Sequence, residues 1–388
     1  MQYRKRDYQQ AASDSAVRAI YANVNGLIVC PTGAGKSLII ADIATRIREP
    51  LLIFQPSKET LEQNFEKLQS YGYEDCSIYS ASLRSKEIAH VTFATIGSVN
   101  NHPEDFDKFR CILVDEAHGI NPKGGMYERF IHRRADRVVI GLTATPYRLT
   151  TSSFGCMLKF LTRTRPRIFT TVIFHVQIQT LLERGYLAPI KYYDLTSIDL
   201  RNVKSNSTGT DYNDESLTAE YERVGFYDKL AYTTLRVLHP KDGSKRNGVL
   251  VFTRFTKEAK SLVEKLADAG IKAAIVTGET PKQEREKLTN DFKSRKIQVI
   301  ANVGIYVVGF DYPELDTVIM ARPTKSLAVW YQAIGREIRP YKGKDAWCID
   351  LGGNLQRFGK LQDLVLKEPK PNMWHVESNG RQLTNVFY

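Results

Sequence analysis

The stretch Leu27–Ile40, LIVCPTGAGKSLII, decides the fold of this chain. It begins with a short apolar run, rich in β-branched residues and closed by Pro31, and this pattern predicts a buried strand. A glycine-rich loop, a Lys-Ser pair and a helical run follow, an order that is typical of a phosphate-binding loop. The backbone N–H groups of such a loop and the N-terminus of its helix together favour a bound anion. The sequence departs from the strict pattern at Cys30, which stands where the first glycine usually lies.

The loop pattern assigns roles to individual side chains. Lys36 is expected to reach the β- and γ-phosphates of ATP, and Ser37 is expected to hold Mg²⁺. The alternative interpretation is a chance glycine-rich turn. The residues predicted to bind the nucleotide here are Pro31, Thr32, Gly33, Ala34, Gly35, Lys36 and Ser37.

Length and composition fit a globular protein of two domains. The chain has 388 residues, of which 42% are hydrophobic and 25% are charged, and these values allow a proper core in each domain. The formal net charge of +12 favours a polyanionic partner such as nucleic acid, although a merely basic protein remains the alternative. The five cysteines are scattered without metal-binding spacing, so we expect neither a zinc site nor a disulfide framework.

The N-terminal sequence, MQYRKRDYQQ, is charged and lacks an apolar core, so we expect no secretory signal. No stretch of the sequence reaches the ~18 apolar residues that a membrane span requires. We therefore expect a soluble protein without membrane partners, located in the cytoplasm of a prokaryotic cell or of an infected host cell.

Short apolar runs alternate with helical patterns along the chain, which predicts an α/β fold with mostly parallel sheets and helices on both faces. In the first half the predicted strands are Leu27–Cys30, Leu51–Phe54, Val91–Phe93, Cys111–Val114 and Val138–Leu142. In the second half they are Ile190–Tyr193, Val249–Phe252, Ala273–Val276, Val299–Ala301, Thr317–Met320 and Ala346–Ile349. The sequence therefore predicts two α/β sheets in tandem.

Domain boundaries follow from these two series of strands. We expect a first domain at residues 1–150, a basic linker at 151–185, a second domain at 186–366 and a C-terminal extension at 367–388. The basic residues of the linker either face nucleic acid or form a solvated edge, and they are Lys159, Arg163, Arg165 and Arg167. The polar stretch Arg201–Glu215 is expected to be a surface excursion of the second domain.

Two carboxylates follow directly after the predicted strand Cys111–Val114, in the sequence CILVDEAH. Beside a phosphate site, Asp115 is expected to hold the hydration shell of Mg²⁺, and Glu116 is expected to polarise the attacking water. His118 is expected to couple the site to movement. The alternative for the acidic pair is a helix cap with exposed carboxylates.

A second group of candidate catalytic residues lies near the end of the chain. Gln332, Arg336 and Arg339 are three to four residues apart, a spacing that predicts one face of a helix. An arginine from this face could neutralise charge on the transferring phosphoryl group, an effect worth ~10³–10⁵ in rate. The alternative is a solvated basic helix face.

With these motifs in place, the chain resembles a superfamily 2 helicase with a DEAH-type box, most similar to the bacterial RadD and XPB-like group. PTGAGKS looks like motif I, DEAH like motif II and TATP, which contains Thr143 and Thr145, like motif III. By itself the TATP turn would be a structural cap, and the resemblance implies that its two threonines couple the sites. The resemblance also implies two RecA-like domains, with ATP and Mg²⁺ in the cleft between them.

The resemblance extends to further motifs. The N-terminal RDYQ looks like a Q-motif variant, in which Arg6 would stack on adenine and Gln9 would bond its edge. QPSKETL and ATIGS look like motifs Ia and Ib, and VFTR looks like motif IV. These motifs imply contacts with a nucleic-acid backbone from Pro56, Ser57, Lys58, Thr95, Gly97, Thr253 and Arg254. VGIYVVGFD looks like motif V, which implies that Gly309 and Asp311 approach the nucleotide, and QAIGREIRP looks like motif VI.

The expected function is ATP-dependent unwinding of DNA, or translocation on DNA, in repair, recombination or replication. The expected partner is single-stranded or branched DNA, and we expect the protein to be a monomer. Two alternatives remain: an RNA helicase or ribonucleoprotein remodeller, and a nucleotide-gated clamp that binds nucleic acid without motor activity.

Overall fold

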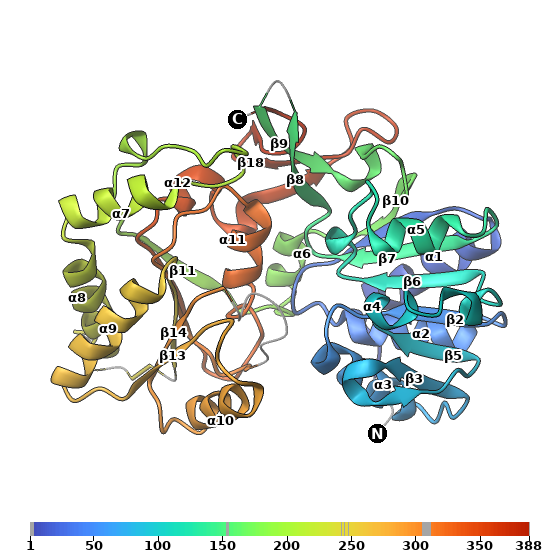
Figure 1. Ribbon diagram of the computed structural model, residues 1–388, viewed down its shortest axis with the longest axis horizontal. Helices are drawn as coiled ribbons and strands as arrows, with labels where there is room; N and C mark the ends of the chain where they lie inside the picture. The colour runs from blue at the N-terminus through green and yellow to red at the C-terminus, as the bar shows by residue number, and fades with distance from the viewer. Residues whose placement is uncertain are drawn as a thin grey trace. The chain divides into compact units, whose positions relative to one another are not determined.

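The computed structural model describes residues 4–152, 155–241, 243, 245–246, 248–304 and 312–387. The chain folds into two compact units (Figure 1). Unit 1 comprises Met1–Arg148, Lys159–Thr180 and Leu366–Val376. Unit 2 comprises Leu149–Leu158, Leu181–Val365 and Glu377–Tyr388.

Unit 1 is built on an eight-stranded sheet. Its strands are β1 (Gly26–Val29), β2 (Leu51–Phe54), β3 (Cys76–Ser80), β4 (Ser85–Lys86), β5 (Val91–Ala94), β6 (Cys111–Asp115), β7 (Val138–Thr143) and β10 (Thr171–His175). Their order across the sheet is β10-β1-β7-β6-β2-β5-β3-β4. All neighbours pair in parallel except β4, which is antiparallel to β3. The central strands β1, β2, β6 and β7 are buried along their whole length, as expected for a parallel sheet that is covered on both faces.

The first helix of unit 1 precedes β1, and the others connect parallel strands. They are α1 (Asp7–Tyr21), α2 (Lys36–Arg46), α3 (Lys58–Gln69), α4 (Ile96–Val99) and α5 (Met126–His132). Short 3₁₀ turns add η1 (Ala81–Leu83), η2 (Pro103–Phe106), η3 (Ala117–Gly119) and η4 (Leu161–Arg163). Because helices follow β1, β2 and β5, the amino ends of α2, α3 and α4 lie at the carboxyl edge of the sheet, where α/β proteins bind ligands.

Unit 2 is built on a six-stranded parallel sheet. Its strands are β11 (Ile190–Asp194), β12 (Val249–Phe252), β13 (Ala273–Val276), β14 (Val299–Asn302), β15 (Thr317–Met320) and β16 (Ala346–Asp350), in the order β11-β16-β15-β12-β14-β13. Its helices are α7 (Asp214–Arg223), α8 (Phe226–Leu238), α9 (Thr256–Asp268), α10 (Lys282–Lys293), α11 (Leu327–Ile334) and α12 (Asn354–Phe358), with η5 (Leu200–Asn202) and η6 (Leu361–Asp363). One face of the sheet packs against α7, α8 and α9 in a core that includes Tyr221, Phe226 and Leu262.

The remaining elements lie in segments whose sequence gave weaker signals. β8 (Tyr147–Ser152) and β9 (Gly155–Phe160) form a two-stranded sheet, and α6 (Ile178–Glu183) follows β10. β17 (Leu364–Lys367), β18 (His375–Ser378) and β19 (Arg381–Gln382) form a three-stranded sheet near the end of the chain.

Every strand predicted from the sequence is present, with ends that differ by at most one residue. The α/β fold with mostly parallel sheets is thereby confirmed. The range 151–185, for which we expected a linker, is more regular than a linker, since it contains β9, β10 and α6. Its strand β10 pairs with β1 at the edge of the first sheet. β10 is an edge strand that is only partly buried, although its sequence, TVIFH, contains an apolar run like those of the predicted strands.

Candidate active site

The phosphate-binding loop connects β1 to α2 at the carboxyl edge of the unit 1 sheet. Gly33 and Gly35 both have φ of 79°, a left-handed conformation that glycine adopts without steric cost. Gly35 is the residue that precedes the first turn of α2. Pro31, Thr32 and Ala34 are buried, and the partly exposed residues of the loop are Gly33, Gly35, Lys36 and Ser37. The predicted loop residues therefore lie together around the amino end of a helix, as an anion site requires.

A chain of polar contacts joins this loop to the ends of β6 and β7. Lys36 Nζ lies 3.3 Å from Glu116 Oε1, and the other carboxylate oxygen lies 3.3 Å from His118 Nδ1. The same imidazole nitrogen lies 3.0 Å from Thr143 Oγ1. The backbone N–H of Thr145 donates to Thr143 Oγ1 at 3.0 Å. The chain of contacts therefore connects residues from three separate motifs.

Burial and charge give the two neighbouring carboxylates different acidities. Burial, together with the charge of Glu116, raises the pKa of Asp115 to about 6. Burial also acts to raise the pKa of Glu116, but the charge of Lys36 and the contact with His118 outweigh it and lower this pKa to about 2. For Lys36, burial disfavours the ammonium, yet the charges of Glu116 and Asp115 prevail and raise its pKa. Lys36 and Glu116 are therefore held as an ion pair at neutral pH.

The site retains a surplus of negative charge that suits a divalent cation. Asp115 Oδ1 accepts a hydrogen bond from the backbone N–H of Glu116 at 2.9 Å, and Asn64 Nδ2 lies 3.4 Å from Asp115 Oδ2. Asp115 and Glu116 together carry two carboxylates against the one ammonium of Lys36. Mg²⁺ prefers oxygen ligands such as carboxylates and hydroxyls. The carboxylate of Asp115, at the end of β6, and the hydroxyl of Ser37, in the first turn of α2, therefore fit this ion.

The backbone at Glu116 is unusual. Its φ of 50° and ψ of 50° lie in the left-handed region, which costs a residue with a side chain on the order of 1–3 kcal/mol. This conformation ends β6 and begins the 3₁₀ turn η3. It directs the Glu116 side chain to the phosphate-binding loop, as the ion pair with Lys36 shows.

Of the two N-terminal residues predicted to bind adenine, Gln9 contacts the loop directly, and Arg6 contacts Gln9 and Tyr8. Gln9 Nε2 donates to the carbonyl oxygen of Ala34 at 2.9 Å, and Gln9 Oε1 accepts from the backbone N–H of Arg6 at 2.9 Å. Tyr8 donates its hydroxyl to the same carbonyl at 2.7 Å. Arg6 Nη1 donates in turn to the Tyr8 hydroxyl at 3.3 Å. Sequence reasoning missed Tyr8, whose aromatic character gave no signal of a polar contact with the loop.

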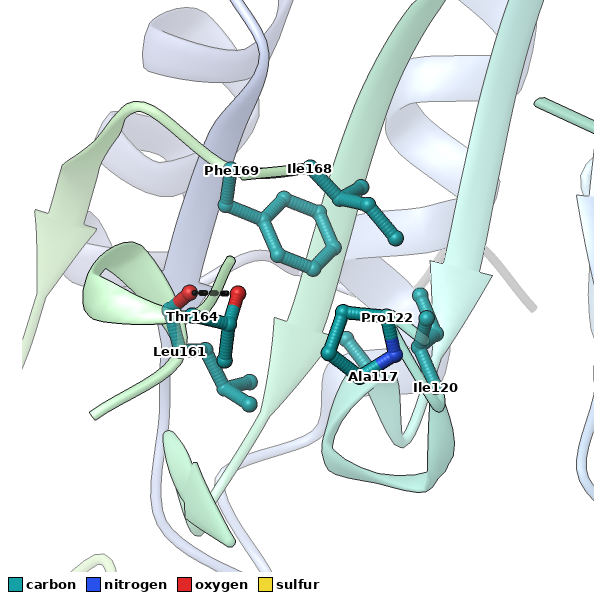
Figure 2. A pocket seen from close by; sticks show the side chains of 7 residues that line it. All are labelled: Ala117, Ile120, Pro122, Leu161, Thr164, Ile168 and Phe169. Atoms are coloured by element: carbon teal, nitrogen blue, oxygen red, sulfur yellow. Dashed lines mark hydrogen bonds between the residues drawn. The ribbon is translucent and has the colours of Figure 1, made fainter. Parts of the chain in front are cut away.

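A small apolar cavity lies behind the turn that carries Glu116. It is lined by Ala117, Ile120, Pro122, Leu161, Thr164, Ile168 and Phe169 (Figure 2). Figure 2 also shows the hydrogen bond that Thr164 Oγ1 donates to the carbonyl oxygen of Leu161. The centre of a water molecule has only about 10 Å³ in which to move, so the cavity has room for one water and for no organic ligand. Its walls instead position η3 against the sheet.

Gly141 of β7 allows this close packing. A Cβ atom at this position would lie 2.7 Å from Ala117 Cβ and 2.7 Å from Phe169 Cζ. We expect Gly141→Ala to lower the free energy of unfolding by ~1–3 kcal/mol, because the turn and the ring must both shift. Denaturant unfolding measures this change. The control is Gly97→Ala, since a Cβ at Gly97 meets nothing within 4 Å; equal stability of the two variants would contradict the packing argument.

The candidate nucleic-acid residues of unit 1 lie side by side at the carboxyl edge of its sheet. Pro56, Ser57 and Lys58 follow β2, while Thr95 and Gly97 follow β5, and these two strands are neighbours. Ser57 Oγ accepts from the N–H of the first turn of α3 at 3.3 Å. The Thr95 and Ser98 hydroxyls lie 2.9 Å apart at the start of α4. Both helix starts therefore present polar groups at one edge, although their contact with nucleic acid stays a prediction.

The corresponding residues of unit 2 are engaged within the protein. Thr253 is fully buried, and its hydroxyl donates to the carbonyl oxygen of Asn302 at 3.3 Å. Arg254 pairs with Asp211 and with Asp214 at 2.8 Å. The side chain of Arg254 is only 16% exposed. Its positive charge is therefore compensated by two carboxylates in this structure.

Glu258 lies beside Arg254 and is fully buried. Its Oε2 accepts from the backbone N–H groups of Arg254 at 3.0 Å and Phe255 at 3.3 Å. Burial raises its pKa from 4.5 to about 8, so the folded state binds a proton that the unfolded state releases. This contribution to stability is complete below pH 4.5 and is lost as the pH rises to about 8.

We therefore expect Glu258→Gln to remove a pH dependence. Between about pH 5 and 8, the unfolding free energy of the unmodified protein should fall relative to the variant by up to ~1.4 kcal/mol per pH unit. Denaturant unfolding at several pH values measures this difference. The control is Glu264→Gln, at an exposed position of the same helix, and its unfolding free energy should change with pH as that of the unmodified protein does. If the unfolding free energy of Glu258→Gln also changes with pH in this way, the raised pKa assigned to Glu258 is contradicted.

The expectation that three motif VI residues share one helix face is wrong. Gln332 lies in α11, but this helix ends at Ile334, so Arg336 and Arg339 lie beyond it. Arg336 is 8% exposed, and its Nε donates to the carbonyl oxygen of Gln332 at 3.2 Å. Burial lowers the pKa of Arg339.

Two further predicted nucleotide contacts lie outside the described residues, namely Gly309 and Asp311.

Comparisons with known proteins match both halves of the chain. Residues 2–148 match the family described as "Type III restriction enzyme, res subunit". Residues 230–340 match the family described as "Helicase conserved C-terminal domain". The two matches contain the phosphate-binding loop and the QAIGREIRP stretch, respectively.

Three similar proteins illustrate these matches. The chain is 26% identical to "Putative ATP-dependent helicase IRC3" of Saccharomyces cerevisiae, over 88% of this chain and 50% of that protein. It is 24% identical to "DNA 3'-5' translocase XPB2" of Sulfurisphaera tokodaii, over 89% of this chain and 81% of that protein. Its fold matches "ATP-dependent Type ISP restriction-modification enzyme LlaBIII bound to DNA" with a TM-score of 0.67 and 18% identity, over 90% of this chain and 28% of that one. The chain thus spans only half the length of the yeast relative.

These similarities show tandem RecA-like domains and homologues among superfamily 2 helicases. They support an enzyme of the class of nucleic-acid-dependent ATPases. In the part of the chain that the structure describes, no helix is both long and apolar enough to cross a membrane.

Proposed function

We propose that this chain, which carries the two domains of superfamily 2 helicases and has helicases as homologues, is an ATP-dependent DNA helicase or translocase. Within the superfamily we assign it to the DEAH-type, RadD- and XPB-like group. The observation that carries the proposal is the contact chain from Lys36 through Glu116 and His118 to Thr143. These contacts join a phosphate-binding loop to a candidate general base and to the end of β7. A purely structural loop would not require them.

The chemistry proposed for unit 1 is hydrolysis of the γ-phosphate of ATP. Lys36 would bind the β- and γ-phosphates, while Ser37 and Asp115 would hold Mg²⁺. Bound Mg²⁺ would neutralise charge on the phosphate oxygens. Glu116, ionised at neutral pH, would orient the attacking water and accept its proton. His118 and Thr143 would transmit the state of the site to the end of β7.

We further propose that unit 2 completes the site. Arg336 would neutralise the charge that develops on the transferring phosphoryl group, with Gln332 and Arg339 binding beside it. In this proposal ATP binds in the cleft between the two domains and closes it, and hydrolysis allows it to open. Such a cycle converts hydrolysis into movement along a strand.

The proposed track is DNA, in repair, recombination or replication. One relative is named as a DNA translocase, and the net charge of +12 suits a polyanion. The contacts proposed for Ser57, Lys58 and Thr95 would address phosphates rather than bases, so binding would be independent of sequence and sensitive to salt.

The test is strand displacement with forked DNA, duplex DNA and a forked RNA of the same sequence. We expect ATP-dependent displacement of a DNA strand by the unmodified protein and none by Glu116→Gln. Movement along duplex DNA without displacement, measured by triplex release, would identify a duplex translocase. Displacement of RNA alone would replace the DNA assignment by RNA remodelling, and binding without movement on any substrate would identify a nucleotide-gated clamp.

A further inference from the structure

Four cations gather at the carboxyl edge of the unit 2 sheet. Arg254 lies two residues beyond the end of β12, and Arg322 lies two residues beyond the end of the neighbouring strand β15. Lys325 follows Arg322 closely in sequence, and Arg357 lies in α12, beyond β16. We call these four residues the cation cluster. Ligands of open α/β sheets bind at this edge.

A polar segment of the chain contacts every member of the cluster. This segment, residues 205–214, is here called the acidic strap. Arg254 Nη2 lies 2.8 Å from Asp214 Oδ1, and Arg254 also pairs with Asp211. The Asp211 oxygen that pairs with Arg254 is Oδ2, and it also lies 3.5 Å from Arg322 Nη2. The Asp211 carboxylate therefore bridges two guanidinium groups, as a phosphate group does between paired arginines.

The other two cations meet the strap at Tyr212. Lys325 Nζ lies 5.4 Å from the centroid of the Tyr212 ring and 3.4 Å from the carbonyl oxygen of Gly209. Arg357 Nη1 donates to the Tyr212 hydroxyl at 3.3 Å. The strap thus places one buried aromatic ring and two carboxylates among four cations.

The ion pairs of Asp211 are largely buried, whereas Asp214 lies at the surface. Asp211 and Arg322 are each 19% exposed, and Asp214 is 65% exposed. Replacement of the Asp211 carboxylate by a phosphate keeps an anion against Arg254 and Arg322, so these guanidinium groups are not left without a counter-charge. A nucleic-acid strand carries many phosphates, so it can compete with a carboxylate for these cations.

We propose that the cation cluster binds a backbone phosphate of a nucleic-acid strand, and that Asp211 of the acidic strap occupies this site while no strand is bound. This inference rests on the proposed function, because it supplies a second phosphate site for the same track. The strap then competes with the nucleic-acid strand for the cation cluster, which weakens the binding of short strands or of strands at low concentration.

The test compares Asp211→Asn with Asp199→Asn. Both substitutions remove one negative charge from the same region of the chain, but Asp199 pairs with Arg201 at 2.7 Å, outside the cation cluster. We expect Asp211→Asn to bind a labelled oligo(dT) strand about tenfold more tightly at low salt, as measured by fluorescence anisotropy. The slope of log affinity against log salt should steepen by about 0.7 per phosphate, because cations freed from Asp211 hold counterions that a strand releases.

A second substitution tests whether the gain arises at the cluster. In the double variant with Arg322→Gln, the gain from Asp211→Asn should disappear. A gain that persists in the double variant, or an Asp211→Asn variant that binds no more tightly than Asp199→Asn, would overturn the proposal. If thermal melting shows that Asp211→Asn is poorly folded, Asp214→Asn gives the same comparison at a more exposed position.

Two arms separate this inference from the proposed function. The unmodified protein is titrated with the same DNA strand and with an RNA strand of equal length. If it binds neither, the proposed function fails. If it binds either strand and Asp211→Asn binds that strand no better than the control, only the strap proposal fails.

Discussion

Replacing Glu116 by glutamine is expected to lower the turnover of ATP by about 10²–10⁴-fold, the contribution that general base catalysis typically makes. Glutamine keeps the size of the side chain, but its amide cannot accept a proton from the attacking water. The nucleotide should still bind, because the loop glycines and Lys36 are unchanged. Steady-state turnover and the affinity for a fluorescent ATP analogue measure the two effects separately.

A second substitution in the same site should lower both turnover and the affinity for ATP. Lys36→Ala removes the ammonium that lies 3.3 Å from Glu116, and we expect this variant to lose affinity for ATP as well as turnover. Both variants should still bind nucleic acid. Turnover by Glu116→Gln within threefold of the unmodified protein would contradict the role assigned to Glu116.

Replacing Arg336 by alanine is the second change with a large expected effect. If this arginine neutralises charge on the transferring phosphoryl group, turnover should fall by ~10³–10⁵-fold, while affinity for the nucleotide changes much less. Arg336→Lys should recover only part of the rate, because a lysine cannot form the paired hydrogen bonds of a guanidinium. Single-turnover hydrolysis measures the chemical step.

The matched control for this experiment is Arg201→Ala. Arg201 is also in unit 2, but its side chain is 90% exposed and pairs with Asp199. Its loss should leave hydrolysis unchanged. If the two substitutions lower turnover equally, Arg336 has no specific catalytic role. The same holds if weaker binding of the nucleotide fully explains the lower turnover of Arg336→Ala.

The central strands could be predicted from sequence because their signal is local. Each is a short apolar run such as Leu51–Phe54, bounded by turn residues, and burial on both faces of a parallel sheet demands this pattern. β10 also contains an apolar run, Val172–Phe174, but it lies in the range that we expected to be a linker and was not predicted as a strand. The regular structure in the expected linker follows from pairing with β1, a long-range contact that no local pattern encodes.

The candidate site was predictable where spacing fixes geometry. The loop from Pro31 to Ser37 has this property, because strand, glycines and helix must follow one another directly. Spacing failed for Arg336, since the helix ends at Ile334 and the three-to-four residue rule applies only within a helix. The pairing of Arg254 with Asp211 was also invisible, because those residues are far apart in the sequence.

The most direct test of the central claim is the rate of ATP turnover with and without single-stranded DNA, at low and at high salt. We predict strong stimulation by DNA at low salt, loss of that stimulation at high salt as phosphate contacts weaken, and turnover by Glu116→Gln that is about 10²–10⁴-fold lower under both conditions. Turnover that is the same with and without DNA, and likewise with duplex DNA and RNA, would contradict a nucleic-acid-dependent ATPase.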